Sequence, residues 1–223
     1  MAAFLLWAGM ATPASAQGPP QATGTRGGRW EIGGGIGFVG GMDLGNATAE
    51  LTPNTGTPAS GAQLFQTESR VGSGFGLQGR IGFLLTRSLS VEGGVRWTRP
   101  TFEISVTNDL EDAPDTTAEE TIDEFVFDGS AVYHFRNAAF SNGRGVPFVT
   151  GGAGYLRELH EGRTLTEDGW EFHAGGGIKW WFGARGRLGL RAEGGLSIRN
   201  GGVDPDGGSS AVPYAGSSVF WVF

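Results

Sequence analysis

The chain has 223 residues, a net charge of −7 at neutral pH, 42 glycines and no cysteine. The lack of cysteine excludes a disulfide scaffold, cysteine metal ligands and a cysteine nucleophile, and the acidic charge argues against nucleic acid as a partner. Aromatic residues make up 11% of the chain, too many for a disordered protein. No apolar run reaches the roughly 18 residues that a membrane-spanning helix needs, although a barrel strand crosses a membrane with about 10 alternating residues.

The first residues have the pattern of an export signal. Residues 2–10 form a short apolar run, and residues 11–16 end in the small-x-small sequence Ala14-Ser15-Ala16. This pattern predicts a secretory signal peptide over residues 1–16, cut before Gln17, with a buried N-terminal helix as the alternative. Residues 17–28 are polar and rich in proline and glycine, which predicts a flexible leader before a domain over residues 29–223.

From Trp30 onward, apolar residues occupy every second position in seven segments: 30–38, 75–85, 89–97, 125–135, 170–182, 188–198 and 215–223. This period predicts strands with one apolar face, and the length of residues 146–159 predicts an eighth strand of open register. The connections alternate between long and short along the chain. We therefore expect an all-β protein, an eight-stranded antiparallel up-and-down barrel with its short turns on the periplasmic side.

The face opposite the apolar residues carries all the charges of these segments and many of the glycines. Small residues leave room for long charged side chains, as the interior of a narrow barrel requires. Aromatic residues gather near both ends of the apolar face, as at the two interfaces of a membrane. The pattern therefore predicts a transmembrane barrel with lipid-facing apolar residues. A soluble lipocalin-like barrel with the faces reversed is the alternative.

The last strand ends in Val219-Phe220-Trp221-Val222-Phe223. A terminal Phe with apolar residues two and four positions earlier resembles the bacterial outer-membrane barrels, and residues 172–180 with 187–193 are similar to the penultimate hairpin of the small eight-stranded class. That class includes the OmpA transmembrane domain and the OmpX- and OmpW-like proteins. The resemblance implies a place in the outer membrane, contact with its lipids and lipopolysaccharide, and an assembly signal at Val219, Trp221 and Phe223 that the barrel-assembly machinery reads.

The charged positions of the inner face are the first candidate site. Arg80 and Glu92 flank one short turn, and Arg191 and Glu193 lie opposite Lys179 across another. Because an isolated buried ion is very costly, we expect an ion-paired network that fills the lumen. A gated ion path through rearranging pairs is the alternative. The network comprises Glu31, Arg80, Glu92, Arg96, Asp128, Glu171, Lys179, Arg191 and Glu193.

Other candidate chemistry is weaker. The segment 109–124 holds eight acidic residues and no base, which predicts a solvated, self-repelling loop, with a Ca²⁺ or Mg²⁺ site that could bridge to lipopolysaccharide phosphates as the alternative. His134 falls near the periplasmic rim, His173 in the outer half of the lumen and His160 in a surface loop, and none has an evident serine partner. We therefore expect no catalytic site, no resident metal and no cofactor.

We interpret the chain as a monomeric barrel that acts structurally, or in interaction or adhesion through its outward loops, with a possible extracellular ligand. The largest of these loops, residues 44–70, is polar and rich in threonine, glycine and proline, which predicts a mobile segment. A narrow porin-like or OmpW-like channel for small or hydrophobic solutes is the alternative. The bulky Trp181 and Phe220 on the inner face argue against a continuous channel.

Overall fold

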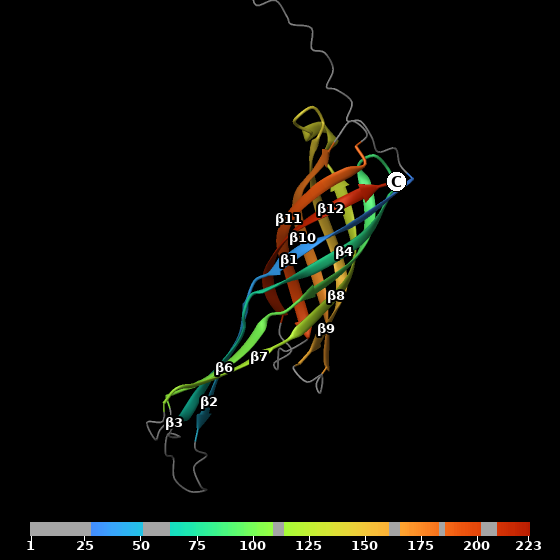
Figure 1. Cartoon of the computed structure of the whole chain (residues 1–223). Helices are drawn as coiled ribbons and strands as arrows, with labels where there is room; N and C mark the ends of the chain where they lie inside the picture. Colours follow the sequence, from blue (N-terminus) through green and yellow to red (C-terminus); the bar gives the residue numbers. More distant parts are fainter. Residues whose placement is uncertain (1–27, 51–62, 109–113, 161–165, 183–185, 202–208) are drawn as a thin grey trace, which may run out of the picture.

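The computed structural model describes residues 28–50, 63–108, 114–160, 166–182, 186–201 and 209–223. Eight strands close into an antiparallel barrel in the order β1-β12-β11-β10-β9-β8-β5-β4 (Figure 1). Their bounds are β1 Arg29–Val39, β4 Gly74–Leu84, β5 Leu89–Thr98, β8 Asp123–His134, β9 Gly145–Leu159, β10 Thr166–Phe182, β11 Leu188–Gly201 and β12 Ser209–Val222. The predicted fold class is confirmed. The signal peptide expected over residues 1–16 lies outside the described residues.

The register of the barrel follows from the two-residue period. The N-terminal strand β1 pairs with both β12 and β4, so that the sheet closes on itself. Aromatic pairs join β1 to β4 at both ends, with ring centroids 5.0 Å apart for Trp30 and Phe83 and 4.9 Å apart for Phe38 and Phe75. Strand β9, whose register the sequence left open, pairs with β8 and β10 along its length.

The barrel is apolar outside and charged inside. On the outer surface Ile36 is 61% exposed and Phe75 is 72% exposed, whereas Glu31 and Arg191 are buried inside at 3% and 2%. A protein in water would leave this apolar surface uncovered, so the arrangement fits a lipid surround. No helix in the described part of the chain is long and apolar enough to span a membrane. The 3₁₀ turn η1 (Arg136–Ala138) lies between β8 and β9.

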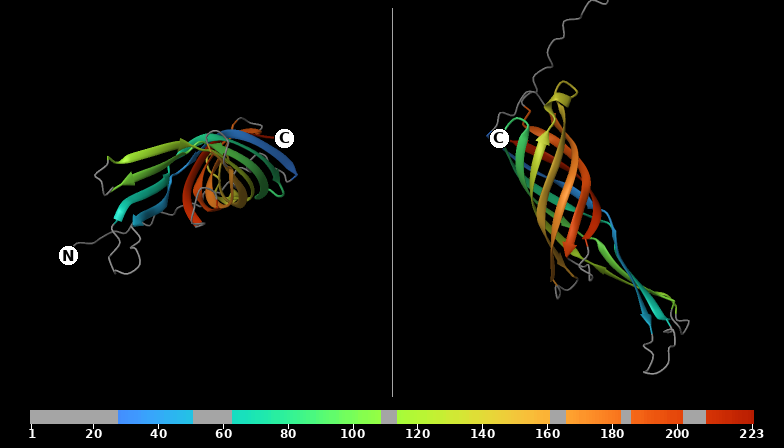
Figure 2. Two further views of the ribbon diagram at one scale, coloured as in Figure 1. Left: turned by 90° about the horizontal axis from the view of Figure 1, so that it is seen from below. Right: turned by 180° about the vertical axis from the view of Figure 1, so that it is seen from behind.

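Four further strands form a second sheet, ordered β2-β3-β6-β7, that projects from the barrel end opposite the C-terminus (Figures 1 and 2). They are β2 Met42–Glu50, β3 Gln63–Val71, β6 Thr101–Thr107 and β7 Thr116–Thr121. Strands β2 and β3 cover residues 44–50 and 63–70 of the segment predicted to be a mobile loop, and for these residues the loop prediction is wrong. Pairing of β3 with β6 joins two hairpins that would each be marginal alone.

Cross-strand pairing gives the projecting sheet one apolar and one polar face. We call the first the apolar sheet face after its apolar members, Ala47, Ala49, Phe65, Val71, Phe102, Ile104, Val106 and Ala118; Thr67, Ser69, Thr116 and Glu120 share this side. The opposite face carries charged and polar side chains, including the ion pair of Arg70 with Glu103. At the base of the apolar sheet face, Leu44, Val71 and Ile122 are buried together against Met42 and Phe102. This small core fastens the sheet to the barrel.

Candidate functional site

Three bases and three acids form one buried cluster in the half of the lumen nearer the C-terminus. Lys179 Nζ lies 2.7 Å from Glu31 Oε1 and 3.2 Å from Glu92 Oε1. Arg191 Nη1 donates to Glu92 Oε2 at 2.6 Å, and its Nε donates to Glu193 Oε2 at 2.8 Å. These residues meet because β10 and β11 pair Lys179 with Arg191 directly, which aims both side chains into the lumen.

Arg80 completes this inner cluster. Its guanidinium lies 3.5 Å from Glu92 Oε2 and also binds the carboxylate of Glu193. The cluster is therefore charge-balanced, which is the condition for keeping ions out of water at tolerable cost. We call it the inner ion cluster; its members are Glu31, Arg80, Glu92, Lys179, Arg191 and Glu193.

A second group of ion pairs lies toward the outer end of the lumen. Arg96 donates to both oxygens of Glu171 at 2.8 Å. Arg199 lies 3.3 Å from Glu171 and donates to Glu124 at 2.6 Å. Thr98 adds a hydroxyl donor to Glu124 at 2.8 Å. We call Arg96, Glu124, Glu171 and Arg199 the outer ion cluster.

Sequence reasoning missed two members of the outer ion cluster. Arg199 lies one residue beyond the predicted end of its strand, although it shares the parity of Arg191 and Glu193. Glu124 was assigned to the solvated acidic segment, yet it is fully buried at 0% exposure. Continuing the alternation by one residue, past the end of the segment 188–198 and before the start of the segment 125–135, is the signal that finds both residues.

A small polar cavity of about 40 Å³ separates the two clusters. Such a volume holds a few water molecules, not a continuous pore. Side chains with buried donor atoms that lack a protein partner line it: Gln78 Nε2, Arg96 Nε and Tyr214 Oη. Asp128 faces the same cavity and contacts Ser130 and His173, so among the predicted network residues it lies apart from the arginine and lysine pairs.

Asp128, Ser130 and His173 approach one another without forming a catalytic triad. Ser130 Oγ lies 3.0 Å from His173 Nε2 and 2.9 Å from Asp128 Oδ2. The nearest contact of Asp128 with the imidazole, at 4.0 Å, is to the same Nε2 atom. A hydrolase triad instead orients the histidine through a carboxylate on Nδ1. The three groups form a polar contact inside the wall of the cavity.

Apolar side chains close the periplasmic end of the lumen. Trp181 and Phe220 meet edge to face with centroids 5.4 Å apart, and Val146 and Val222 pack against them. Lys179 Nζ lies 5.4 Å from the centre of the Phe220 ring, so the inner ion cluster rests directly on this plug. His134 is buried beside Phe148 at the same end. Apolar and aromatic side chains therefore fill this end of the lumen.

Glycine makes the crowded lumen possible. A Cβ atom on Gly94 would lie 2.4 Å from Asp128 Oδ1, and one on Gly216 would lie 2.6 Å from Gln78 Nε2. A Cβ on Gly177 would meet the backbone oxygen of Ala192 at 2.0 Å. At Gly94 and Gly216 the space is taken by the ends of the Asp128 and Gln78 side chains, whereas at Gly177 the obstacle is the backbone of β11. The high glycine content of the chain thus has a packing cause at these sites.

The acidic segment and His160 differ from their predictions. Residues 116–121 form strand β7 and not a loop, although most of them are exposed to solvent as expected. His160, expected on a surface loop, is buried at 9% and lies 3.2 Å from Glu120 and 3.6 Å from Glu167. Asp109, Glu111 and Asp112 lie outside the described residues. Among the described residues, no group of three or more histidine, aspartate or glutamate side chains is arranged to hold a metal ion.

No protein-family model matches the chain, and no curated protein matches its sequence. Similar solved structures exist. The outer membrane protein OprG from Pseudomonas aeruginosa is 13% identical, with a TM-score of 0.53 over 90% of this chain and 98% of that chain. The N-terminal β-barrel domain of Pseudomonas aeruginosa OprF is 13% identical (TM-score 0.43, 89% and 100% covered), and the outer membrane protein AlkL in lipid bilayers is 15% identical (TM-score 0.40, 97% of each chain).

The likeness to OprG decides the fold. This is the fold of a small outer-membrane β-barrel. The expected resemblance to that class is confirmed at the level of fold, and the soluble alternative with reversed faces is excluded by the exposed apolar wall. The wall fits a lipid surround, as in a barrel that spans a membrane. The projecting sheet lies at the barrel end opposite the C-terminus, where the connections between barrel strands are long.

Proposed function

We propose that this outer-membrane barrel acts at the cell surface as a monomer, structurally or in interaction and adhesion, and that its lumen does not conduct ions. The observation that carries the proposal is the filled lumen. Two layers of buried ion pairs and an apolar plug occupy its length, with one small cavity described between the layers. Interaction is then left to the parts outside the membrane.

Opening the lumen would require the buried pairs to separate. Arg191 and Lys179 are 2% and 1% exposed, and each contacts acidic groups from other strands. Separating a buried ion from its partner costs about 3–5 kcal/mol, so spontaneous opening of several pairs is rare. A static, structural lumen is therefore the better-supported interpretation of the ion network.

The projecting sheet supplies the surface for interaction. Its apolar sheet face holds the partly exposed side chains Phe65, Ile104 and Val106. An apolar surface above the membrane favours contact with other apolar surfaces, because contact removes it from water. This favours attachment to hydrophobic material or to an extracellular ligand with an apolar face.

The proposal also includes assembly and lipid contact. Val219 and Trp221 point to the lipid side of β12, and the backbone of Phe223 bonds that of Trp30 where the barrel closes. A C-terminal strand with this pattern would be recognised by the barrel-assembly machinery before closure. The outer end would contact lipopolysaccharide once the protein is inserted.

Planar-bilayer recording of the purified protein tests the closed lumen. We expect no steady conductance, and a Trp181→Ala/Phe220→Ala variant in the same bilayer controls for the effect of the plug.

Retention of producing cells on polystyrene tests the surface role. A variant with short turns in place of residues 42–71 and 101–121 should be retained less. Steady, ion-selective openings of the unaltered protein, or equal retention of both strains, would contradict the proposal.

A narrow OmpW-like conduit for hydrophobic solutes is the second candidate. The apolar sheet face favours this function. Phe102 and Ile122 at its base have even numbers, like the residues of β5 and β8 that face the lumen. Uptake of a hydrophobic fluorescent dye by producing cells separates the two functions. If the barrel is a conduit, cells that produce it should take up the dye faster than cells that lack it, and this increase should depend on Phe65, Ile104 and Val106. The surface role predicts an unchanged rate.

A further inference from the structure

Outside the lumen, the charged side chains described at the periplasmic end of the barrel are all positive. Among the described residues of the connections and strand ends there (28–30, 85–88, 135–144, 186–188 and 221–223), no aspartate or glutamate occurs. Arginines occur there instead, one at the start of β1, one between β4 and β5, two between β8 and β9, and one before β11. We call them the arginine rim: Arg29, Arg87, Arg136, Arg144 and Arg187.

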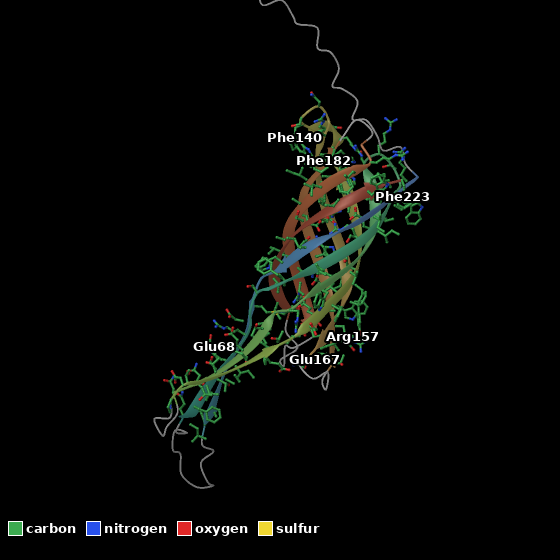
Figure 3. All side chains as sticks on the ribbon, in the orientation of Figure 1. Glu68, Phe140, Arg157, Glu167, Phe182 and Phe223 are labelled. Carbon is green, nitrogen blue, oxygen red and sulfur yellow. The ribbon has the colours of Figure 1, made fainter. Side chains whose placement is uncertain are left out.

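The opposite end of the barrel has the reverse charge. Acidic side chains dominate the projecting sheet and the outer strand ends, and Figure 3 labels Glu68 and Glu167 there, far from Phe140 and Phe223 at the arginine rim. Among the described residues outside the lumen, the arginines at the outer end are Arg70, Arg99 and Arg157. Arg70 and Arg99 are each paired, with Glu103 and Asp123. The molecule is therefore strongly polarised along the barrel axis.

The turns fix the backbone of the arginine rim. The hydroxyl of Thr86 accepts from the amides of Ser88 and Leu89 at 3.2 and 3.0 Å, which shapes the turn that carries Arg87. Arg136 Nε donates to the backbone oxygen of Arg87 at 2.9 Å. Arg144 follows a tight turn with left-handed backbone at residues 141–143. Ordered backbone therefore fixes the points at which the side chains of Arg87, Arg136 and Arg144 leave the chain.

Most of the arginine rim has no counter-ion in the described protein. No ion pair within 4.0 Å joins Arg29, Arg87, Arg144 or Arg187 to a described carboxylate. Burial and the positive charge of Arg87 lower the pKa of Arg136, as expected where cations are crowded. Such an arrangement repels itself unless anions from outside neutralise it.

Aromatic side chains on the lipid face alternate with these arginines. Trp30 is 47% exposed beside Arg29, Phe135 is 40% exposed beside Arg136, and Trp221 pairs with Leu188 next to Arg187. Aromatic residues of this kind lie at the level of the lipid headgroups. The guanidinium groups therefore sit where phosphates lie, and their planar donors match phosphate oxygens.

We propose that the arginine rim binds the phosphate headgroups of anionic phospholipids in the periplasmic leaflet of the outer membrane. The spread of the arginines over separate connections around the barrel fits lipids that surround the protein. A single acidic protein partner would require a compact patch instead.

Native mass spectrometry of the protein released from nanodiscs tests this proposal. The discs contain equal amounts of phosphatidylglycerol and phosphatidylethanolamine, and the readout is the ratio of the two lipids retained. The variant Arg87→Gln/Arg144→Gln/Arg187→Gln removes three exposed arginines of the rim. The matched control Arg70→Gln/Arg99→Gln/Arg157→Gln makes the same charge change at the outer end. Heat-shifted gel mobility shows that each variant is folded.

We expect the unaltered protein and the outer-end variant to retain phosphatidylglycerol preferentially. The rim variant should lose this preference, since each arginine near a membrane surface contributes roughly fivefold to anionic-lipid affinity. Equal retention of the two lipids by the unaltered protein would overturn the proposal. So would an equal loss in both variants, or an unchanged preference in the rim variant, the result expected if an acidic protein is the true partner.

Discussion

Replacing the single residue Arg191 by methionine should strongly lower the free energy of unfolding of the barrel. The guanidinium is 2% exposed and bonds Glu92 and Glu193, while its end lies 4.3 Å from the Phe148 ring centre. Methionine fills the apolar part of that space but leaves the inner ion cluster with Arg80 and Lys179 against three carboxylates. Removing one partner from a buried ion pair costs about 3–5 kcal/mol in free energy of unfolding.

Urea unfolding in detergent micelles, followed by tryptophan fluorescence, measures this cost. With a slope at the upper end of the usual range, about 3 kcal/mol per molar urea, the midpoint should fall by roughly 1 to 2 M. Arg70→Met is the control, because its ion pair with Glu103 is exposed and should give no resolvable shift. The double variant Arg191→Met/Glu193→Gln restores charge balance and should recover part of the loss. Equal midpoints for Arg191→Met and Arg70→Met would refute the idea of a buried, interdependent cluster.

Further predictions test the packing, the lipid face and the assembly signal. Gly177→Ala should cost about 1–3 kcal/mol in unfolding titrations because its Cβ meets backbone, whereas Gly129→Ala, with nothing within 4 Å, should be almost neutral; the reverse order would contradict the packing account. Leu77→Arg on the exposed wall should lower the stability in lipid vesicles by about 2–4 kcal/mol, and an unchanged stability would argue against lipid contact. Phe223→Ala should reduce the amount of barrel in cell outer membranes while purified protein refolds normally. An unchanged amount in the membrane would contradict the assembly signal at this residue.

The barrel was predictable because its strands carry a strong contrast between faces. In β4, Phe75, Leu77 and Ile81 alternate with glycine, glutamine and arginine, so both the strand and its orientation follow from the residues. Strand β2 has no such contrast. Its outward part alternates alanine with threonine and asparagine, and Gly45, with φ of +111°, interrupts the register against β3. The projecting sheet depends on pairing between distant hairpins, which local periodicity does not contain.

The partners within the lumen were only partly predictable. Parity along the strands identifies which charges face inward, as it does for Lys179 and Arg191. Which base meets which acid depends on strand stagger and side-chain reach. Arg96, for example, meets Glu171 on β10, on the other side of the lumen, and not a residue of a neighbouring strand. The composition of the clusters therefore follows from the sequence better than the pairings do.

The orientation of side chains is the central claim, and the chain has no cysteine to interfere with labelling. Spin labels on single cysteines at Ile36, Leu77 and Leu196, all more than half exposed on the wall, can be compared in lipid vesicles for collision with oxygen and with a water-soluble nickel complex. The account predicts that all three labels collide strongly with oxygen, which concentrates in lipid, and weakly with nickel. Labels that collide with nickel and are shielded from oxygen would show that the apolar residues face water or the lumen, and would contradict the account.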